Sequence, residues 1–316
     1  MTQGRFAGCL VGLAIGDALG MPFEGMSAEA IRQRYGKVTE LLPAGRLDAG
    51  QYTDDTKMML CIAESIVERG HVDPEDVARR FTEWFESGDL RGIGSTCLES
   101  ILNLKRGISW RDSGLRGKWA AGNGTAMRIA PVGLIDYHDL ERLREDCWAT
   151  SIITHNNAEA VAGATAVAYA IARLVTGEAD TRTLLPETAA LVEDSEVARN
   201  LEQARSLLSA DTPTGDAVAV LGTSGYVVET VASALYCFLR TPDDFMTTVA
   251  SAVMGGGDTD TTAAIAGAIS GAHNGVLNMP RQLVEEVEDS ERLQALGRAI
   301  YRLANPHEDD DYGPTT

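Results

Sequence analysis

The 316-residue chain is short of cysteine and of positive charge, and each shortage argues against a class of protein. Its five cysteines are scattered, odd in number and without a C-x-x-C pair, which favours neither a disulfide framework nor a zinc site and fits a reducing cytoplasm. The net charge of −19 and the pI near 4.6 leave no basic patch for a nucleic-acid backbone or an anionic membrane. An anionic ligand would therefore need local help from a metal ion or from backbone N–H groups.

Strand patterns and domain breaks are also missing. No segment alternates apolar and polar residues over a strand length, and no linker, repeat or low-complexity tract divides the chain. The apolar opening from Phe6 to Leu19 is interrupted by Asp17, has no basic cluster before it and is too short to span a bilayer. We therefore expect no targeting segment there and interpret this stretch as a buried helix.

Helical periodicity dominates what remains. The sequence predicts one all-α domain over residues 1–305, a single compact multi-helix orthogonal bundle with loops gathered at one end to make a site. A monomer is expected. The acidic tail over 306–316 is predicted to be disordered. A polar loop is expected over 210–225, and the clearest expected helices cover 5–20, 159–174, 227–239, 245–254 and 281–304, with one or two more over 184–209.

The first helix carries small residues at every fourth position: Gly8, Gly12, Gly16 and Gly20. Such a stripe forms a groove that lets another helix approach closely, so this helix is predicted to be central. Asp17 within it is interpreted as a buried carboxylate hydrogen-bonded to a neighbouring turn. Pro22 ends the helix, and Glu24 after it is expected to be a solvated loop acid.

The segment Gly255–Thr262 joins three glycines to Asp258, Asp260 and Thr261. The glycines allow a tight turn, and the Asp and Thr residues are typical of a helix start. Two interpretations stand at this point. The segment is an ordinary helix N-terminus with an acidic first turn, or its hard oxygens bind a cation.

A second acidic segment, Gly50–Thr56, favours the cation. Thr53 is a candidate cap for the helix that follows, but the adjacent Asp54 and Asp55 exceed what a cap needs. If the two helix starts meet, four carboxylates and two or three Thr hydroxyls share one small volume, and like charges there would raise some pKa values. Oxygen ligands favour Mg²⁺, Mn²⁺ or Ca²⁺ over Zn²⁺, and four carboxylates suffice for two ions.

Other candidate site residues lie on loops and keep two interpretations each. The Gly-Asn-Gly run at 122–124 could line a phosphate or ribose pocket with its N–H groups, or be an ordinary turn. Arg128 could bind an anionic substrate or pair with one of the many acids. His155 is typical of a polar loop residue, and the Tyr226 ring could stack on a ligand base or lie in the core.

Five motifs in order give the chain a family resemblance. The sequence resembles the ADP-ribosylglycohydrolase family, which includes the dinitrogenase reductase-activating glycohydrolase and the animal ADP-ribosyl-acceptor hydrolases. The resemblance covers nearly the whole chain, up to about residue 305. It rests on Gly16-Asp17-Ala18-Leu19-Gly20, Thr53-Asp54-Asp55-Thr56, Gly122-Asn123-Gly124-Thr125-Ala126-Met127-Arg128, Thr154-His155-Asn156 and Gly256-Gly257-Asp258-Thr259-Asp260-Thr261.

The resemblance implies an all-α hydrolase with two Mg²⁺ or Mn²⁺ ions that removes ADP-ribose from a protein or small-molecule acceptor at the distal ribose. The implied metal ligands are Thr53, Asp54, Asp55, Asp258, Asp260 and Thr261, and the implied catalytic residues are Glu24, Asp55 and Asp258. The implied substrate-binding residues are Ser95, Gly122, Asn123, Gly124, Thr125, Met127, His155 and Tyr226. The metals would hold the distal ribose and a bridging water that attacks the anomeric carbon, with ADP-ribose as a product. Glu24 matches a mobile loop acid of some family members. Nucleic acid enters only as an ADP-ribosylated substrate, and no membrane partner is expected.

One departure bears on the acceptor. The nitrogenase-regulating branch carries an Asp and an Asn in the turn where this chain has Gly92 and Ser95. That Asp serves arginine-linked substrates, so its absence favours a serine-linked, nucleic-acid-linked or small O-linked ADP-ribose, with Glu24 as the remaining general acid or base. Two other functions stay open: a metal-dependent phosphohydrolase on a nucleotide or phosphorylated ADP-ribose, and a non-catalytic ADP-ribose binder. The intact set of six Thr and Asp ligands argues against the binder.

Overall fold

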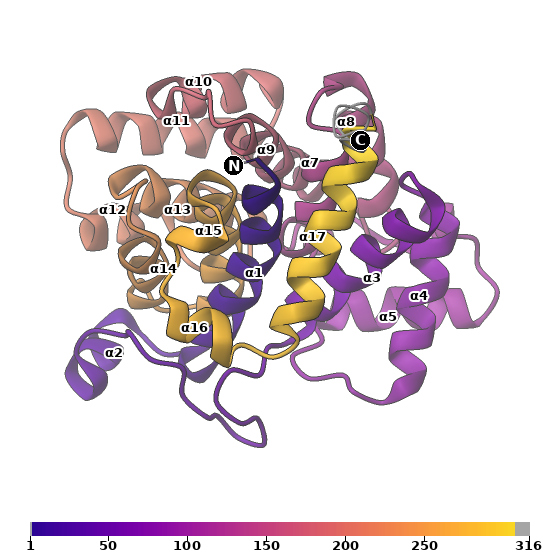
Figure 1. Cartoon of the computed structure of the whole chain (residues 1–316), viewed down its shortest axis with the longest axis horizontal. Coiled ribbons are helices and arrows are strands. Elements are labelled where there is room, and N and C mark those ends of the chain that lie inside the picture. Colours follow the sequence, from indigo (N-terminus) through magenta and orange to yellow (C-terminus); the bar gives the residue numbers. More distant parts are fainter. Residues whose placement is uncertain (1, 307–316) are drawn as a thin grey trace, which may run out of the picture.

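The computed structural model describes residues 2–306, and helices make up almost all of its regular structure (Figure 1). The predicted all-α class is confirmed. The predicted tail lies outside the described residues from position 307 onward. The α-helices are α1 (Thr2–Gly20), α2 (Ala28–Tyr35), α3 (Asp54–Arg69), α4 (Pro74–Ser87), α5 (Ser95–Lys105), α6 (Trp110–Ser113), α7 (Ala130–Ile135), α8 (Leu140–Ser151), α9 (Ala158–Val175), α10 (Thr181–Leu191), α11 (Glu196–Ser209), α12 (Thr214–Leu221), α13 (Val227–Arg240), α14 (Phe245–Met254), α15 (Thr259–Asn274), α16 (Arg281–Glu286) and α17 (Ser290–Ala304).

Helix α1 is the centre of the molecule and packs along α15, with α17 on its other side (Figure 1). The glycine stripe makes this contact possible. A methyl group added to Gly12 would lie 2.2 Å from the carbonyl oxygen of Gly267, and one added to Gly16 would lie 2.0 Å from that of Ala263. The prediction of a close helix–helix approach is confirmed. Because the two helices run together to the C-terminal end of α1, the start of α15 is held beside Gly20.

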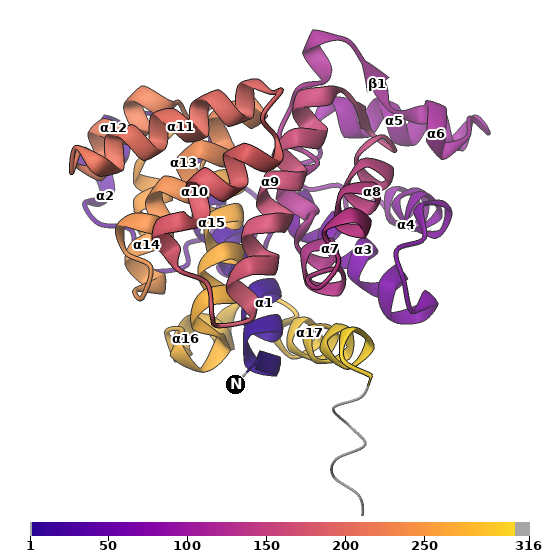
Figure 2. The same ribbon diagram turned by 90° about the horizontal axis from the view of Figure 1, so that it is seen from above.

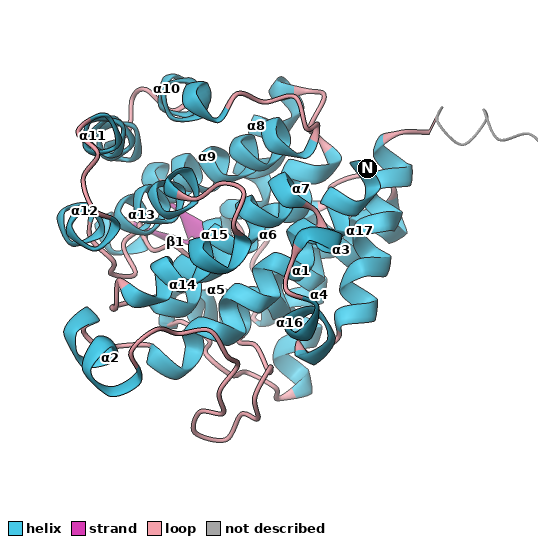
Figure 3. Ribbon diagram, turned by 60° about the vertical axis from the view of Figure 1, so that its left-hand side comes forward, coloured by secondary structure: helices cyan, strands magenta, loops and turns pink. Residues whose placement is uncertain are grey.

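The only strands within residues 2–306 are two-residue pieces, so the prediction of slight sheet content is also confirmed (Figure 3). Strand β1 (Leu115–Arg116) pairs in parallel with β2 (His155–Asn156). Seen from above, β1 lies near α5 and α6 at one edge of the molecule (Figure 2). The pairing matters for the site because it fixes the backbone of His155. Short 3₁₀ helices complete the chain: η1 (Met21–Phe23), η2 (Lys118–Ala120), η3 (Ala126–Arg128) and η4 (Val276–Asn278).

Two sequence predictions about this fold are wrong. The expected loop over 210–225 contains α12, whose Ala217, Val218 and Leu221 share one helical face and are buried. The turn-forming residues on both sides of this short helix made its apolar periodicity hard to recognise in the sequence. The expected single helix over 281–304 is two helices, because the chain turns at Asp289, which has a φ of 58°.

Two helices are long and apolar enough to cross a membrane, judged by length and composition alone: Thr2–Phe23, which joins α1 to η1, and α9. The first corrects the expectation that the opening run is too short, because the helical segment begins before Phe6 and continues past Leu19. Within the structure, 89% of the apolar window in the first helix and 67% of that in α9 are buried. The apolar composition of both helices is thus accounted for by core packing.

Candidate functional site

The start of α3 is held by a carboxylate from another helix. Asp17, fully buried on α1, accepts hydrogen bonds from the backbone N–H groups of Thr53 and Thr56 at 3.0–3.1 Å and from their hydroxyls at 2.8 and 2.7 Å. Thr53 occupies the N-cap position but its side chain makes no cap hydrogen bond, contrary to the prediction that it caps the helix. The Asp17 carboxylate takes this role instead. Because the Thr53 hydroxyl donates its proton to Asp17, its lone pairs remain free to bind a cation.

The start of α15 shows the same departure from ordinary capping. Asp258 is the N-cap residue, yet its side chain makes no cap hydrogen bond. Its Oδ2 instead accepts from the side-chain amide of Asn123 at 2.9 Å. Two helix starts thus have oxygen-bearing cap residues whose side chains do not cap. This observation weakens the interpretation of either segment as an ordinary helix start.

The two helix starts share one cavity of about 290 Å³. Its lining includes five carboxylates, from Glu24, Asp54, Asp55, Asp258 and Asp260. Of the other predicted site residues, the cavity is lined by Ser95, Gly122, Asn123, Gly124, Met127, His155 and Thr261. Sequence segments more than two hundred residues apart therefore converge as the motifs suggested.

Three predicted site residues do not line this cavity. Thr53 lies behind it, bonded to Asp17. The Thr125 hydroxyl donates to the carbonyl of Ala160 at 2.8 Å, so it holds α9 rather than facing a ligand. The Tyr226 hydroxyl reaches Glu196 at 2.5 Å while its ring packs against the core, and only its backbone adjoins the site, in a bridge to Gly122.

Backbone hydrogen bonds hold the Glu24 loop against the start of α15. Gly25 N–H donates to the carbonyl of Gly257, and Gly257 N–H donates back to that of Met26, both at 2.8 Å. Gly257 has a φ of 75°, which favours glycine, and a methyl group there would lie 2.3 Å from the carbonyl oxygen of Thr223. These contacts place Glu24 beside Asp258 at the wall of the cavity.

Burial and neighbouring charge raise the pKa values of four carboxyl groups in the cavity. Burial, with the charge of Asp17 next, raises the pKa of Asp54 to about 7. The pKa values of Asp55 and Asp260 are also raised well above their ordinary value, first by burial and then by neighbouring carboxylates. Burial and the charges of Asp258 and Asp17 also raise the pKa of Glu24. Ionised together, these groups need a positive charge among them.

The donor set fits one or two hard divalent cations. It consists of carboxylate and hydroxyl oxygens, which suit Mg²⁺ and Mn²⁺. The Oδ2 atom of Asp55 is buried and has no hydrogen-bond partner among residues 2–306, as a ligand atom would be before metal binds. No group of three His, Cys, Asp or Glu side chains in that range is already arranged around one point. Asp258 accepts a hydrogen bond from Asn123, and Asp260 accepts one from the N–H of Thr261.

The Gly-Asn-Gly turn lies against the edge of the His155 ring. Asn123 N–H donates to the carbonyl of Gly225 at 3.0 Å, which fixes the turn. A methyl group on Gly124 would lie 2.7 Å from the His155 ring, so glycine leaves the imidazole edge open. His155 is 3% exposed and borders the cavity, in contrast to the polar loop residue expected from its local sequence. Burial and the nearby charge of Arg128 lower its pKa to about 3, so the ring is neutral.

Arg128 corrects both sequence interpretations. Its guanidinium is fully buried and lies 4.7 Å over the Phe81 ring. Its hydrogen bonds go to Thr154 Oγ1 at 2.7 Å and to the carbonyl of Thr150 at 3.2 Å, with Met58 and Cys97 sulfurs at 3.6 and 3.9 Å. It neither lines the cavity nor forms an ion pair within the described part of the chain.

Sequence reasoning missed four lining residues: Gly94, Thr96, Cys97 and Gly225. Gly92 and Ser95, named from the sequence in the same turn, were the signals for the first three. Gly92 has a φ of 81°, and a methyl group there would lie 2.7 Å from Asp54 Oδ1 and 2.8 Å from Thr53 Cβ. Any side chain at position 92 would therefore displace a predicted metal ligand.

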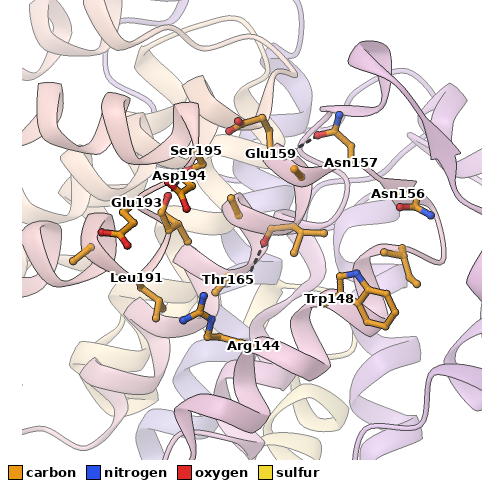
Figure 4. Close-up of a pocket in the computed structure, with 16 residues that line it drawn as sticks. Arg144, Trp148, Asn156, Asn157, Glu159, Thr165, Leu191, Glu193, Asp194 and Ser195 are labelled. Carbon is orange, nitrogen blue, oxygen red and sulfur yellow. Dashed lines mark hydrogen bonds between the residues drawn. The ribbon is translucent and has the colours of Figure 1, made fainter.

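A second hollow of about 550 Å³ lies beyond β2, between α8, α9 and the α10–α11 turn (Figure 4). Trp148 and Arg144 line it from α8, and Glu193 and Asp194 line it from the opposite turn. Although larger than the acidic cavity, it is lined by three carboxylates, from Glu159, Glu193 and Asp194, rather than five, and Arg144 is also part of its lining. Its residues serve below as controls for variants of the acidic cavity.

Comparisons with known proteins agree with this geometry. The family model described as ADP-ribosylglycohydrolase matches residues 1–310. A protein of Archaeoglobus fulgidus that is named only as uncharacterized is 39% identical, over 95% of this chain and 96% of its own. The ADP-ribosylarginine hydrolase Tri1 of Pseudomonas putida is 30% identical, over 95% of this chain and 78% of its own. A solved structure titled ADP-ribosylglycohydrolase-related protein complex superposes with a TM-score of 0.74 at 29% identity, covering 96% of this chain and 99% of the other.

Proposed function

The chain belongs to the ADP-ribosylglycohydrolase family, and we propose that it is a divalent-metal-dependent hydrolase that cleaves the glycosidic bond between ADP-ribose and an acceptor. One observation supports this most strongly. At the starts of α3 and α15, Thr53 and Asp258 both stand at cap positions without capping, and five carboxylates line the cavity between these helix starts. Such an arrangement stabilises neither helix as an ordinary cap would, but it suits a cation-dependent reaction.

The proposed metal ligands are Thr53, Asp54, Asp55, Asp258, Asp260 and Thr261. Bound Mg²⁺ or Mn²⁺ would supply a Lewis acid and lower the pKa of a water molecule. The protein's own groups do the rest. Asp17 orients the Thr53 oxygen by accepting the hydrogen bond from its hydroxyl, and Asn123 holds Asp258 at the cavity wall. The Gly-Asn-Gly backbone and His155 form the side against which a diphosphate or ribose would lie.

Glu24 is the proposed general acid or base. It lies outside the predicted ligand set, and partial burial together with the charges of Asp258 and Asp17 raises its pKa, which suits a carboxyl group that transfers a proton. Two backbone hydrogen bonds to Gly257 keep it beside Asp258. Its role in the reaction would be to transfer a proton at the bond that breaks.

We infer an O-linked acceptor, such as ADP-ribosylated serine, a nucleic-acid end or a small molecule. The inference rests on Gly92, where a side chain would collide with Asp54. No second carboxylate can therefore be supplied from this turn, and Glu24 is left as the acid that is not a metal ligand. The name of the Pseudomonas relative specifies an arginine linkage, so a comparison of acceptors decides between the two.

The experiment measures ADP-ribose release from serine-linked, arginine-linked and nucleic-acid-linked substrates with Mg²⁺ and with EDTA. We expect release from O-linked substrates, lost with EDTA and in Asp54→Asn and Asp258→Asn. Trp148→Ala, in the separate hollow, should retain activity. Asp54→Asn with full activity would contradict the metal assignment.

Titration with ADP-ribose alone separates the remaining possibilities. Binding that weakens with EDTA supports the cavity as the ADP-ribose site. Release of inorganic phosphate instead of ADP-ribose would identify a phosphohydrolase and overturn the proposal. Faster turnover of the arginine-linked substrate would keep the hydrolase but overturn the O-linked assignment.

A further inference from the structure

A chain of three polar side chains leads from the buried Arg128 to the cavity. Arg128 Nη2 donates to Thr154 Oγ1 at 2.7 Å, and Thr154 Oγ1 lies 2.8 Å from His155 Nδ1. All three residues are at most 3% exposed. The other ring nitrogen, His155 Nε2, lies beside Gly122 and Gly124 at the cavity and has no hydrogen-bond partner within residues 2–306.

Proton counting along this chain fixes the orientation of each bond. A guanidinium only donates, so Thr154 Oγ1 must accept from Arg128. Thr154 has a single hydroxyl proton, which must go to His155 Nδ1 or toward the nearby Cys97 sulfur. A thiol sulfur is a weak acceptor, and burial raises the pKa of Cys97 to about 11, so this group is not a thiolate. The proton therefore goes to the imidazole nitrogen, and His155 Nδ1 is an acceptor.

A neutral ring with an accepting Nδ1 carries its own proton on Nε2. If Nδ1 carried the proton instead, Thr154 Oγ1 would accept hydrogen bonds from both Arg128 and His155, and its own proton could be donated only to the Cys97 sulfur. We propose that Arg128 and Thr154 are positioning residues that hold His155 as the Nε2–H tautomer, so that its ring donates a hydrogen bond to an oxygen atom of the ligand in the cavity.

This assignment separates the two groups in the cavity that could move a proton. His155 acts as a fixed donor that orients a phosphate or ribose oxygen, and it neither takes up nor releases a proton in the reaction. Glu24 on the opposite side is left with that task. The identity of the ligand rests on the proposed function, but the tautomer does not.

The buried charge of Arg128 explains why the Thr154 hydroxyl lies between Arg128 and His155. Arg128 lies over an aromatic ring and two sulfurs, with no carboxylate in hydrogen-bond contact among the described residues. Its positive charge disfavours a second positive charge on the imidazole. The same charge polarises the Thr154 hydroxyl, which then donates to His155 more strongly.

The test uses protein labelled with ¹⁵N at histidine and long-range proton–nitrogen NMR spectra, without any ligand. The chain has five histidines, and His155→Gln assigns the signal. In the wild type we expect His155 Nδ1 to resonate as an unprotonated nitrogen and Nε2 as a protonated one. Thr154→Val, which keeps the shape but removes the hydroxyl, should give a mixture of tautomers, while Thr154→Ser should restore the single form.

A binding readout accompanies the spectra. Thr154→Val should weaken ADP-ribose binding up to about 10-fold, the effect of one neutral hydrogen bond, and Thr154→Ser should not. Thermal unfolding checks that both variants are folded. A wild-type His155 protonated on Nδ1, or a Thr154→Val protein with unchanged tautomer and affinity, would overturn the proposal. If the wild type shows the Nε2–H form but does not bind ADP-ribose, the tautomer assignment is supported and the proposed function is contradicted.

Discussion

From the cluster of buried carboxylates we predict that Asp54, a proposed metal ligand, destabilises the metal-free protein. Burial and neighbouring carboxylates raise the pKa of Asp54 from an ordinary 3.8 to about 7 in the folded state. At about 1.4 kcal/mol for each pH unit, ionised Asp54 costs about 4 kcal/mol of folding stability at pH 8. At pH 5 the folded protein is mostly protonated at this site, and the cost is about 1.5 kcal/mol.

The sign follows from proton binding. Between pH 3.8 and about pH 7 the folded state holds a proton that the unfolded state has lost, so the free energy of unfolding falls as pH rises through this window. Asp54→Asn removes this dependence. Its amide will be imperfectly paired, which costs about 1–3 kcal/mol at any pH. We therefore expect the variant to gain about 1–3 kcal/mol over the wild type at pH 8 and to match or fall below it at pH 5.

Urea unfolding followed by far-UV circular dichroism in EDTA measures both values. Asp89→Asn is the matched control. Arg91 and Lys57 lower the pKa of Asp89 to about 2, so the stabilisation of the fold by ionised Asp89 is unchanged between pH 5 and pH 8. An equal effect of Asp54→Asn at the two pH values would refute the reasoning. Saturating Mg²⁺ should reverse the order of stability at pH 8, since only the wild type keeps its full ligand set.

Three further predictions follow from single contacts. Gly12→Ala should lower the free energy of unfolding by about 1–3 kcal/mol or more, because the added methyl group meets the Gly267 carbonyl. Gly4→Ala lies on the same helix and has nothing within 4 Å of the added methyl group, so in the same urea titration it should be neutral or slightly stabilising. Glu24→Gln should reduce kcat more than ADP-ribose affinity, and unchanged turnover would remove it from the mechanism. The buried Asp136 carboxyl beside Asp146 has its pKa raised to about 8, first by burial, so the wild type should lose stability from pH 6 to pH 8 more steeply than Asp136→Asn; parallel pH profiles would contradict this.

The fold could be predicted from sequence where a local pattern decides the structure. The four glycines along one face of α1 predicted a close helix partner, because small residues at that spacing form a groove that lets another helix approach closely. Helix α14 was predicted over the residues that form it, since an apolar run lies between a capping Asp244 and the glycine turn. Helix α12 was missed because eight residues between turn formers carry too few apolar positions to reveal a period.

The convergence of the two acidic segments could be predicted from the sequence, but the contacts that support them could not. Adjacent carboxylates in excess of capping needs mark Asp54 and Asp55 in the sequence itself. Nothing local shows that Asp17 caps α3 from another helix, or that Thr154 links a buried arginine to His155, because these contacts join residues by tertiary packing alone. Arg128 was misread for the same reason. In an acidic chain an arginine is expected to meet a carboxylate, and only the fold shows that it meets a hydroxyl.

Burial of the carboxylates in the acidic cavity lowers the stability of the metal-free fold and favours the binding of a cation. In water, Asp54, Asp55 and Asp260 would be screened from one another and would keep ordinary pKa values. Because they are buried between two helix starts, they disfavour their own ionised state and so favour a cation that neutralises them. The opposite wall has no such charge, because glycines and a neutral imidazole donor form it. Under the proposed function, a ligand that is anionic at one end and rich in hydroxyl oxygens at the other would match this division, with its hydroxyls toward the carboxylates and its phosphates toward His155 and the glycine turn.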